Sequence, residues 1–230
     1  MNPNAPLVLV AHHRETCGGL LPGLLERVGI IRRVHPFDGE ALPAHRQVRG
    51  AIVMGSRHCV HEKIEGLDRE REWLDGLLAD NKPVLGICFG AQLIGLAAGA
   101  IVRRGEFAEH GPCMIHPAKG QHLLMTPMQV MQWHEDGVFY LPSSCQRIAT
   151  GGSIYPEQAF QFGSAIGLQF HPEATADMLA RWLGRDPHLF PPGPEREALF
   201  DGLSEMDPVR HWLAALVDHL FAEPVSHLRG

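Results

Sequence analysis

The sequence has no run of Lys and Arg longer than a pair, no apolar stretch long enough to span a membrane, and no basic, apolar leader at its start. Its formal net charge is −6 at pH 7. Nucleic-acid-binding proteins gather basic residues into patches, so a nucleic-acid partner is not expected. Targeting and membrane-spanning segments need a sustained apolar stretch, so we expect a cytoplasmic protein with no membrane partner.

Cysteine is sparse and shows no pairing pattern. The five cysteines are odd in number and widely spaced, which indicates neither a disulfide framework nor a zinc ribbon; they are Cys17, Cys59, Cys88, Cys113 and Cys145. His58 and His61 flank Cys59 and could be metal ligands, but no second cluster has a ligand spacing. We therefore expect free thiols, no metal and no cofactor.

The order of apolar runs and amphipathic segments indicates an α/β fold: an open, mainly parallel sheet flanked by helices, with a small antiparallel strand region and C-terminal helices. Short continuous apolar runs are typical of strands buried on both faces. The predicted strands are 7–10, 50–54, 83–87 and 165–170, the predicted helices are 67–78, 89–100 and one after Pro208, hairpins are expected within 101–150, and 185–194 is expected to be a surface connector. With 45% hydrophobic and 20% charged residues, we expect a single domain over 1–230.

A candidate nucleophile lies where the strand 83–87 meets the following helix, in the segment Gly86-Ile87-Cys88-Phe89-Gly90. Small residues two positions before and after a nucleophile are typical of a sharp strand-to-helix turn that exposes it. At a helix start, Cys88 would meet unpaired backbone N–H groups and the positive end of the helix dipole, both of which favour a thiolate. The local pattern fits a small buried cysteine equally well.

A candidate base lies at the end of the last predicted strand, in Gly167-Leu168-Gln169-Phe170-His171-Pro172-Glu173. The carboxyl ends of parallel strands form the edge where α/β proteins build their sites. Pro172 favours an extended backbone at His171, and Glu173 is close enough in sequence to orient the imidazole and stabilise its cation. Taken alone, a histidine that ends a strand by chance is the alternative.

Together the two segments resemble the class I glutamine amidotransferases, in the elements Gly86 to Gln92 and Gln169 to Glu173. Stand-alone proteins similar to the amidotransferase domain of GMP synthase are nearest in pattern. They are matched additionally by Gln132-Trp133-His134 with Leu141-Pro142, and by Gln158-Ala159-Phe160. The resemblance covers about Leu7 to Asp177, in order.

The resemblance implies that Cys88 attacks the side-chain amide of glutamine while His171, oriented by Glu173, transfers protons. A glutamyl thioester and free ammonia would result. It also implies that Gln92 contacts the substrate glutamine, although Gln92 could be only a polar helix residue. Trp133 and His134 match a loop near the glutamine pocket, with an aromatic packing residue beside an exposed histidine as the alternative.

The resemblance further implies an oxyanion hole of two backbone N–H groups, each worth about 3 kcal/mol in the transition state. The Phe89 N–H is expected to be one donor. The other matches the loop after Met54, where the family usually has two glycines and a proline and this chain has Gly55-Ser56-Arg57. Gly55 and Ser56 still carry N–H groups, but a non-glycine residue is strained at positive φ, so we expect an altered or rearranging loop.

The resemblance implies that the ammonia passes to a synthetase, but the residues after His171 contain no nucleotide-binding loop. We therefore expect glutamine to be the substrate, and the expected partner is a separate ammonia-accepting synthetase subunit. Two alternatives stay open. One is a stand-alone hydrolase of γ-glutamyl amides, and the other is a binding or regulatory protein that keeps the fold and has an inert Cys88.

Overall fold

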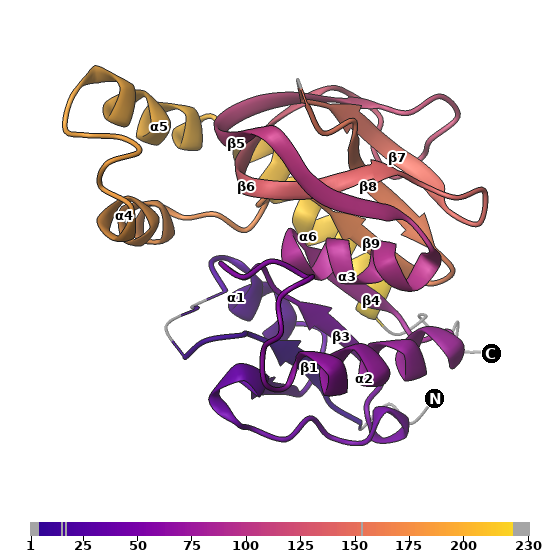
Figure 1. Ribbon diagram of the computed structural model, residues 1–230. Coiled ribbons are helices and arrows are strands. Elements are labelled where there is room, and N and C mark those ends of the chain that lie inside the picture. Colours follow the sequence, from indigo (N-terminus) through magenta and orange to yellow (C-terminus); the bar gives the residue numbers. More distant parts are fainter. Residues whose placement is uncertain (1–4, 15, 17, 153, 223–230) are drawn as a thin grey trace.

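The computed structural model describes residues 5–14, 16, 18–152 and 154–222, and within these ranges one mixed sheet of nine strands runs through the molecule (Figure 1). The strand order is β2-β1-β3-β4-β9-β8-β7-β5-β6. The strands are β1 (Leu7–Val10), β2 (Ile31–Val34), β3 (Gly50–Val53), β4 (Val84–Ile87), β5 (Ile101–Pro117), β6 (Met128–Tyr140), β7 (Gln146–Gly151), β8 (Glu157–Phe162) and β9 (Ala165–Leu168).

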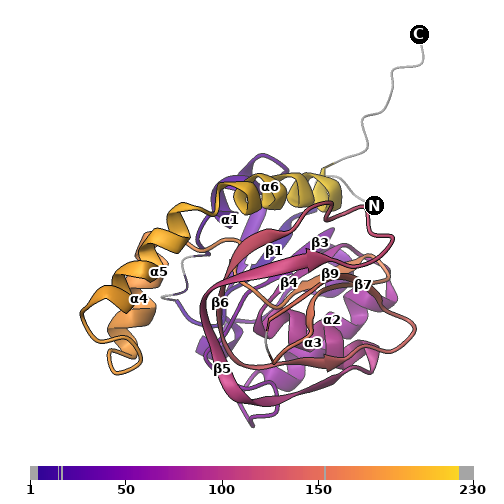
Figure 2. The same ribbon diagram turned by 90° about the horizontal axis from the view of Figure 1, so that it is seen from above.

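Helices cover the parallel part of the sheet on both faces. They are α1 (Leu21–Glu26), α2 (Leu67–Ala79), α3 (Phe89–Ala98), α4 (Ala176–Arg185), α5 (Pro194–Ser204) and α6 (Asp207–Phe221), with two short 3-10 helices at Pro36–Asp38 and His45–Gln47. Figure 2 shows α1 and α6 on one face and α2 and α3 on the other. None of the helices in these described ranges is long and apolar enough to cross a membrane.

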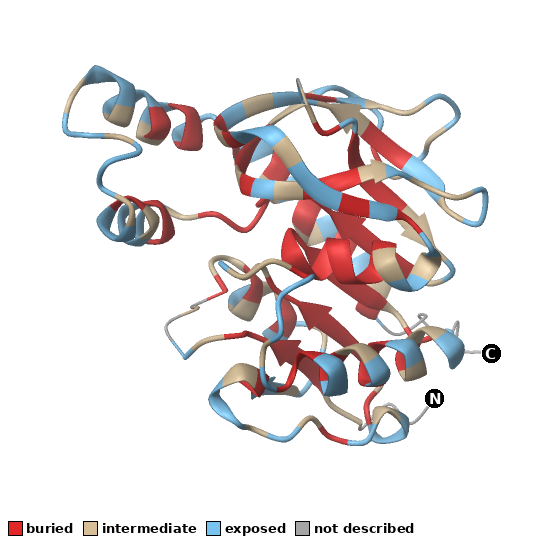
Figure 3. Cartoon of the chain, in the orientation of Figure 1, coloured by how far each residue is buried: buried red, intermediate tan, exposed pale blue. Residues whose placement is uncertain are grey.

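The apolar strands are buried on both faces, as their composition predicts. In β1, Val8 and Val10 join the core that includes α2 and α3, whereas Leu7 and Leu9 join the core that includes α1 and α6. Successive side chains of a strand point to opposite faces, so a strand between two helix layers needs apolar residues at every position. Figure 3 shows this burial concentrated in the central strands.

The predicted parallel sheet is confirmed for half of the structure, where β2, β1, β3, β4 and β9 pair in parallel. The antiparallel region is larger than predicted, because β5 has 17 residues and β6 has 13. Gly111, Pro112 and Gly137 lie inside these strands in regular pairs, and the pairing shifts its register between Arg104 and Glu109. The sheet is therefore mixed, with one parallel part and one antiparallel part.

Two helices project from the body beside each other, α4 and α5 (Figure 1). Residues 186–193 link them and are half-buried or exposed along their whole length. This segment overlaps the predicted connector. The single domain over 1–230 stays a prediction.

The carboxyl ends of four neighbouring parallel strands meet at one edge of the sheet. In the register, Val10 pairs with Val53, Val53 with Gly86, and Ile87 with Leu168. The residues that follow these strands therefore share one edge, although they are far apart in sequence. Both candidate motifs follow strands of this set.

Candidate functional site

Cys88 joins β4 to α3 on a strained turn. Its backbone angles are φ 52° and ψ −105°, and in the described ranges Cys88 and Asn81 are the only non-glycine residues with positive φ. Such backbone costs about 1–3 kcal/mol and persists only where its surroundings enforce it. The Cys88 N–H donates to the Leu168 carbonyl at 2.7 Å, which ties the turn to β9. The thiol therefore lies at the amino end of α3, as the sequence predicts.

The two glycines around Cys88 allow close packing. A Cβ on Gly86 would lie 2.5 Å from the carbonyl carbon of Gly90, and a Cβ on Gly90 would lie 2.1 Å from the carbonyl oxygen of Val53. Neither glycine has positive φ. Any side chain at these positions would push the first turn of α3 off β3 and β4, so the small residues let the helix start directly behind the thiol.

His171 and Glu173 form a buried pair beside Cys88. His171 Nδ1 lies 2.9 Å from Glu173 Oε1, and the two residues are 6% and 0% exposed. The His171 N–H also donates to the Met131 carbonyl at 2.8 Å, which fixes the backbone against β6. Burial opposes the imidazolium, but the charge of Glu173 and a hydrogen bond with Cys88 outweigh it and raise the pKa of His171 to about 10. The imidazole is therefore protonated at neutral pH.

The loop after β3 runs directly beside this group. A Cβ on Gly55 would lie 2.9 Å from His171 Cε1 and 3.5 Å from Cys88 Cβ, so only glycine fits there without a shift. Ser56 and Arg57 follow without positive φ, so the serine in place of the family's glycine carries no left-handed strain. Phe89, the first residue of α3, has a backbone N–H that the helix itself leaves unpaired.

The expected substrate residues lie in the same pocket. Gln92 is 3% exposed, and its Nε2 donates to the Asp136 carbonyl at 2.8 Å. Trp133 and His134 lie inside strand β6 and not in a loop, which corrects the sequence-based interpretation. His134 is buried, with Nε2 at 2.9 Å from Gln132 Oε1, and burial followed by the charge of His171 lowers its pKa to about 3. It is therefore neutral.

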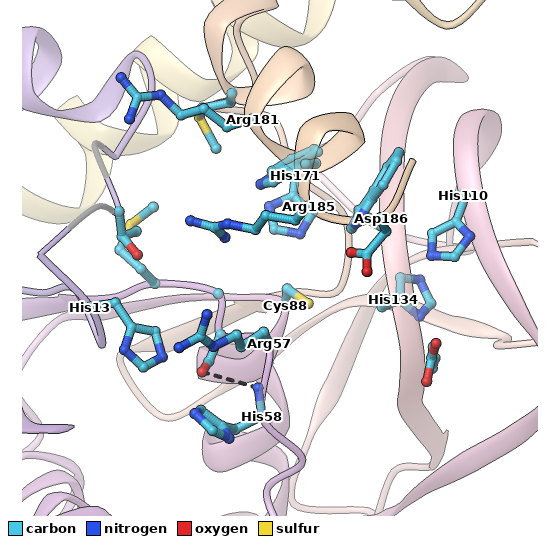
Figure 4. Close-up of a pocket in the computed structure, with 18 of the residues that line it drawn as sticks. His13, Arg57, His58, Cys88, His110, His134, His171, Arg181, Arg185 and Asp186 are labelled. Carbon is cyan, nitrogen blue, oxygen red and sulfur yellow. Dashed lines mark hydrogen bonds between the residues drawn. The ribbon is translucent and has the colours of Figure 1, made fainter. Parts of the chain in front are cut away.

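The pocket has a volume of about 550 Å³ and extends well beyond the two motifs. Figure 4 shows Cys88 in its middle, with His13, Arg57 and His58 on one side and the α4 residues Arg181 and Arg185 on another. Trp182 of α4 lies between Trp133 and His171, with ring centroids at 5.2 and 4.9 Å. No local motif marks α4 as part of a site. Its amphipathic pattern is the sole signal, and that pattern also fits a helix that only packs.

A second group that no motif predicts contacts Gly55, which lines the pocket. His12, after β1, contacts Glu70 of α2 through Nε2 at 3.0 Å, and both side chains are 0% exposed. The signals are a histidine at the end of an apolar run and an acidic residue near the apolar face of a helix. Neither signal predicts the pairing, because the two residues are 58 positions apart.

The other histidines and cysteines show different surroundings. His58 Nδ1 lies 2.8 Å from Glu62 Oε2, and His61 Nε2 donates to the Val102 carbonyl at 2.9 Å. Across the described ranges, no three His, Cys, Asp or Glu side chains are grouped closely enough to hold a metal ion. Burial raises the pKa of the thiols of three half-buried cysteines, which are Cys59, Cys113 and Cys145. Cys17 lies outside the described residues.

Curated relatives of the chain are GMP synthases. One of the subunits of the glutamine-hydrolyzing GMP synthase of Methanocaldococcus jannaschii is 28% identical over 157 residues, which cover 66% of this chain and 79% of that protein. GMP synthase of Borreliella burgdorferi is 26% identical over 178 residues, 75% of this chain and 34% of that protein. The chain spans about a third of the length of the GMP synthases that are longer than it is, such as the one from Borreliella burgdorferi.

Solved structures share the whole fold. A glutamine amidotransferase from Thermotoga maritima has a TM-score of 0.85 at 24% identity, and the match covers 96% of this chain and 99% of that one. A glutamine amidotransferase from Methylobacillus flagellatus has a TM-score of 0.85 at 20% identity, with 98% and 99% covered. At these identities the likeness shows the fold alone.

The family model for glutamine amidotransferase class-I matches residues 35–181. The matched segment is more than half of the chain and contains both motifs, with Cys88, His171 and Glu173. With the shared fold, this places the chain in the class I glutamine amidotransferase family.

Proposed function

We propose that this protein hydrolyses the side-chain amide of glutamine through a Cys88-His171-Glu173 triad and releases ammonia for a separate acceptor enzyme. The observation that carries the proposal is a thiol on a strained turn at a helix start, beside an imidazole whose other nitrogen contacts a fully buried carboxylate. Nucleophile, base and orienting group thus stand in the order that acyl transfer requires.

In the first step the Cys88 thiolate attacks the amide carbon and forms a tetrahedral intermediate. The imidazolium of His171 then donates its proton to the departing nitrogen, the C–N bond breaks, and ammonia leaves a glutamyl thioester on Cys88. The raised pKa of His171 supports this order, because the proton is present on the ring before the leaving group needs it. Glu173 keeps the ring oriented and balances its charge.

In the second step His171, now neutral, takes a proton from water, and the resulting hydroxide attacks the thioester carbon. The C–S bond breaks, the new γ-carboxyl group loses its proton to water, and glutamate leaves with the thiolate and the imidazolium restored. Both steps place negative charge on the former carbonyl oxygen. We assign its stabilisation to the Phe89 N–H and to the Gly55–Ser56 loop, which lies beside Cys88. We assign contacts with the substrate to Gln92, Trp133 and His134, which line the same pocket.

The proposed partner is a synthetase subunit that accepts the ammonia. The support comes from the relative in Methanocaldococcus jannaschii, whose name designates one of the subunits of a glutamine-hydrolyzing GMP synthase and of which this chain covers most. A coupled partner of this kind would raise glutamine turnover when it binds.

Ammonia release from glutamine by the purified chain tests the proposal. Wild-type protein should release ammonia and glutamate in equal amounts, and Cys88→Ala should release neither while it unfolds at a similar temperature, because Ala retains the small volume and removes the nucleophile. Turnover by Cys88→Ala at the wild-type rate would overturn the triad.

A stand-alone γ-glutamyl amide hydrolase is the second candidate, and the size of the pocket favours it. Pockets of about 300–1,000 Å³ hold ligands far larger than glutamine, and this one continues past Cys88 to α4. A substituent on the amide nitrogen would have room there. γ-Glutamyl-p-nitroanilide and γ-glutamyl dipeptides should then be cleaved faster than glutamine, and Arg181→Ala should lower kcat/KM for the conjugates only. If the wild type and Arg181→Ala both cleave glutamine faster than the γ-glutamyl conjugates, this candidate is excluded.

A further inference from the structure

His12 contacts the loop that carries the proposed oxyanion donor. Its Nδ1 lies 3.1 Å from the Gly55 carbonyl oxygen, and its Nε2 lies 3.0 Å from Glu70 Oε1. His12 and Glu70 are both 0% exposed. The imidazole therefore connects the amino-terminal part of α2 to the loop and has no access to solvent.

The two acceptors fix where the protons lie. A carbonyl oxygen only accepts, so Nδ1 must carry a proton and donate it to Gly55. The second nitrogen faces a carboxyl oxygen, so a further proton lies between Nε2 and Glu70 Oε1, on one atom or the other. With Glu70 as the partner of Nε2, both ring nitrogens are satisfied while Nδ1 presents its N–H to the Gly55 carbonyl.

Aromatic packing fixes the plane of the ring. The His12 centroid lies 4.8 Å from that of Phe37 and 4.7 Å from that of Phe89, the latter in an edge-to-face arrangement. Phe89 is the residue whose N–H we assign as the first oxyanion donor. His12 therefore contacts both segments that would form the oxyanion hole.

The orientation of the Gly55 carbonyl determines where the next N–H points. The described peptide bonds are all trans, and in a trans peptide the carbonyl and the following N–H point in opposite directions. With its oxygen held by His12 on the buried side, the Gly55–Ser56 peptide directs the Ser56 N–H to the opposite side, where Gly55 and Ser56 line the pocket. Preorganised donors of this kind stabilise the transition state without reorganisation.

We propose that His12, held by Glu70, is a positioning residue that orients the Ser56 N–H as an oxyanion donor. The proposal rests on the glutaminase function proposed above. It explains how a loop with Ser56 in place of the family's glycine keeps a catalytic orientation: the carbonyl is held from below by a side chain, and backbone strain is not needed.

Two substitutions at position 12 separate the two hydrogen bonds. Asn carries its amide nitrogen two bonds from Cβ, as histidine carries Nδ1, so His12→Asn can still donate to Gly55. Gln carries its amide nitrogen three bonds from Cβ, as histidine carries Nε2, so His12→Gln keeps the link to Glu70 and loses the donor to Gly55. Glu70→Gln can donate to Nε2 and so keeps the ring anchored to α2 with its proton on Nδ1, whereas Glu70→Ala leaves Nε2 without that anchor.

The rate of glutamine hydrolysis should depend on whether each variant keeps a hydrogen-bond donor to the Gly55 carbonyl. A lost or misplaced oxyanion donor lowers kcat by about 10²-fold, so we expect that loss for His12→Gln, little change in KM, and recovery of most of kcat in His12→Asn. Glu70→Gln should likewise retain most of kcat, and Glu70→Ala should not. Lys82→Met is the control for stability alone, because Lys82 is a buried residue that donates to the Val48 carbonyl at 2.7 Å and does not line the pocket.

Alkylation of Cys88 by iodoacetamide provides the second readout. This reaction displaces iodide at a saturated carbon and forms no oxyanion, so it requires the thiolate and access but not the Ser56 N–H. Each variant should be alkylated at the wild-type rate, including those with low kcat. Equal kcat losses in His12→Asn and His12→Gln, or losses that follow the unfolding temperature, would overturn the positioning role. A wild type that is alkylated but hydrolyses neither glutamine nor other γ-glutamyl amides would overturn the proposed function itself.

Discussion

Because the backbone at Cys88 is strained, we expect the Cys88→Gly variant to be more stable than the Cys88→Ala variant. Both Cys88→Gly and Cys88→Ala remove the thiol, so the comparison isolates the backbone. Alanine must adopt the same φ of 52° that the structure imposes on cysteine, whereas glycine adopts positive φ readily. The cysteine would then be retained for chemistry, at the expense of stability.

The expected difference follows from two opposing terms. Strain at such an angle costs about 1–3 kcal/mol for a residue with a side chain. Glycine lowers the free energy of unfolding by about 0.5–1 kcal/mol relative to alanine, because it has more conformational freedom in the unfolded chain. Cys88→Gly should therefore be more stable than Cys88→Ala by about 1 kcal/mol, which for a chain of this size corresponds to about 2–4 °C in Tm.

Differential scanning calorimetry of the two variants measures this difference. The control is Ala97→Gly at an exposed position of α3, where the same exchange of Ala for Gly meets ordinary helical backbone and should lower stability by about 0.5–1 kcal/mol. Glycine in place of alanine should thus raise stability at position 88 and lower it at position 97. A Cys88→Gly variant less stable than Cys88→Ala would refute the strained turn.

Two further predictions concern the histidines of the site. His171→Ala should lower glutamine turnover at least about 10³-fold and Glu173→Ala less, because Glu173 orients the ring and transfers no proton; equal or reversed losses in a steady-state assay would mean that these roles are wrong. Folding lowers the pKa of His134 from 6.5 to about 3, so its stabilising contribution is present above about pH 6.5 and is lost as the pH falls towards 3. Between pH 7 and pH 5 the wild type should therefore lose about 2 kcal/mol more unfolding free energy than His134→Leu in urea titrations, and parallel pH curves would contradict the neutral buried ring.

The sequence was sufficient for the parallel core and for the two motif segments around Cys88 and His171, because their signals are local. Continuous apolar runs correspond to β1, β3, β4 and β9, and the glycines around Cys88 report how closely α3 approaches β3 and β4. The glycine pattern depends on neighbours a few residues away, and the apolar runs depend on burial that is the same at every position of a strand. A single sequence displays both kinds of signal directly.

The rest depended on pairings between distant residues. Hairpins were expected within 101–150, but β5 and β6 pair along long stretches that include Gly111, Pro112 and Gly137, with register shifts only after Ile101 and between Arg104 and Glu109. Glu70 of α2 is buried against His12, which follows β1, and the two residues are 58 positions apart, so no local signal shows their pairing. The contribution of α4 to the pocket depends in the same way on tertiary packing.

Selective labelling of Cys88 tests the central claim most directly, because it requires no knowledge of the acceptor or the partner. Burial raises the pKa of the Cys59, Cys113 and Cys145 thiols, whereas Cys88 lies at a helix start beside His171. A glutamine-like electrophile, applied briefly at neutral pH and followed by peptide mass spectrometry, should label Cys88 first and almost completely, and excess glutamine should slow the labelling. Faster labelling of another cysteine, or no protection by glutamine under conditions where hydrolysis is detected, would contradict a glutamine site at Cys88.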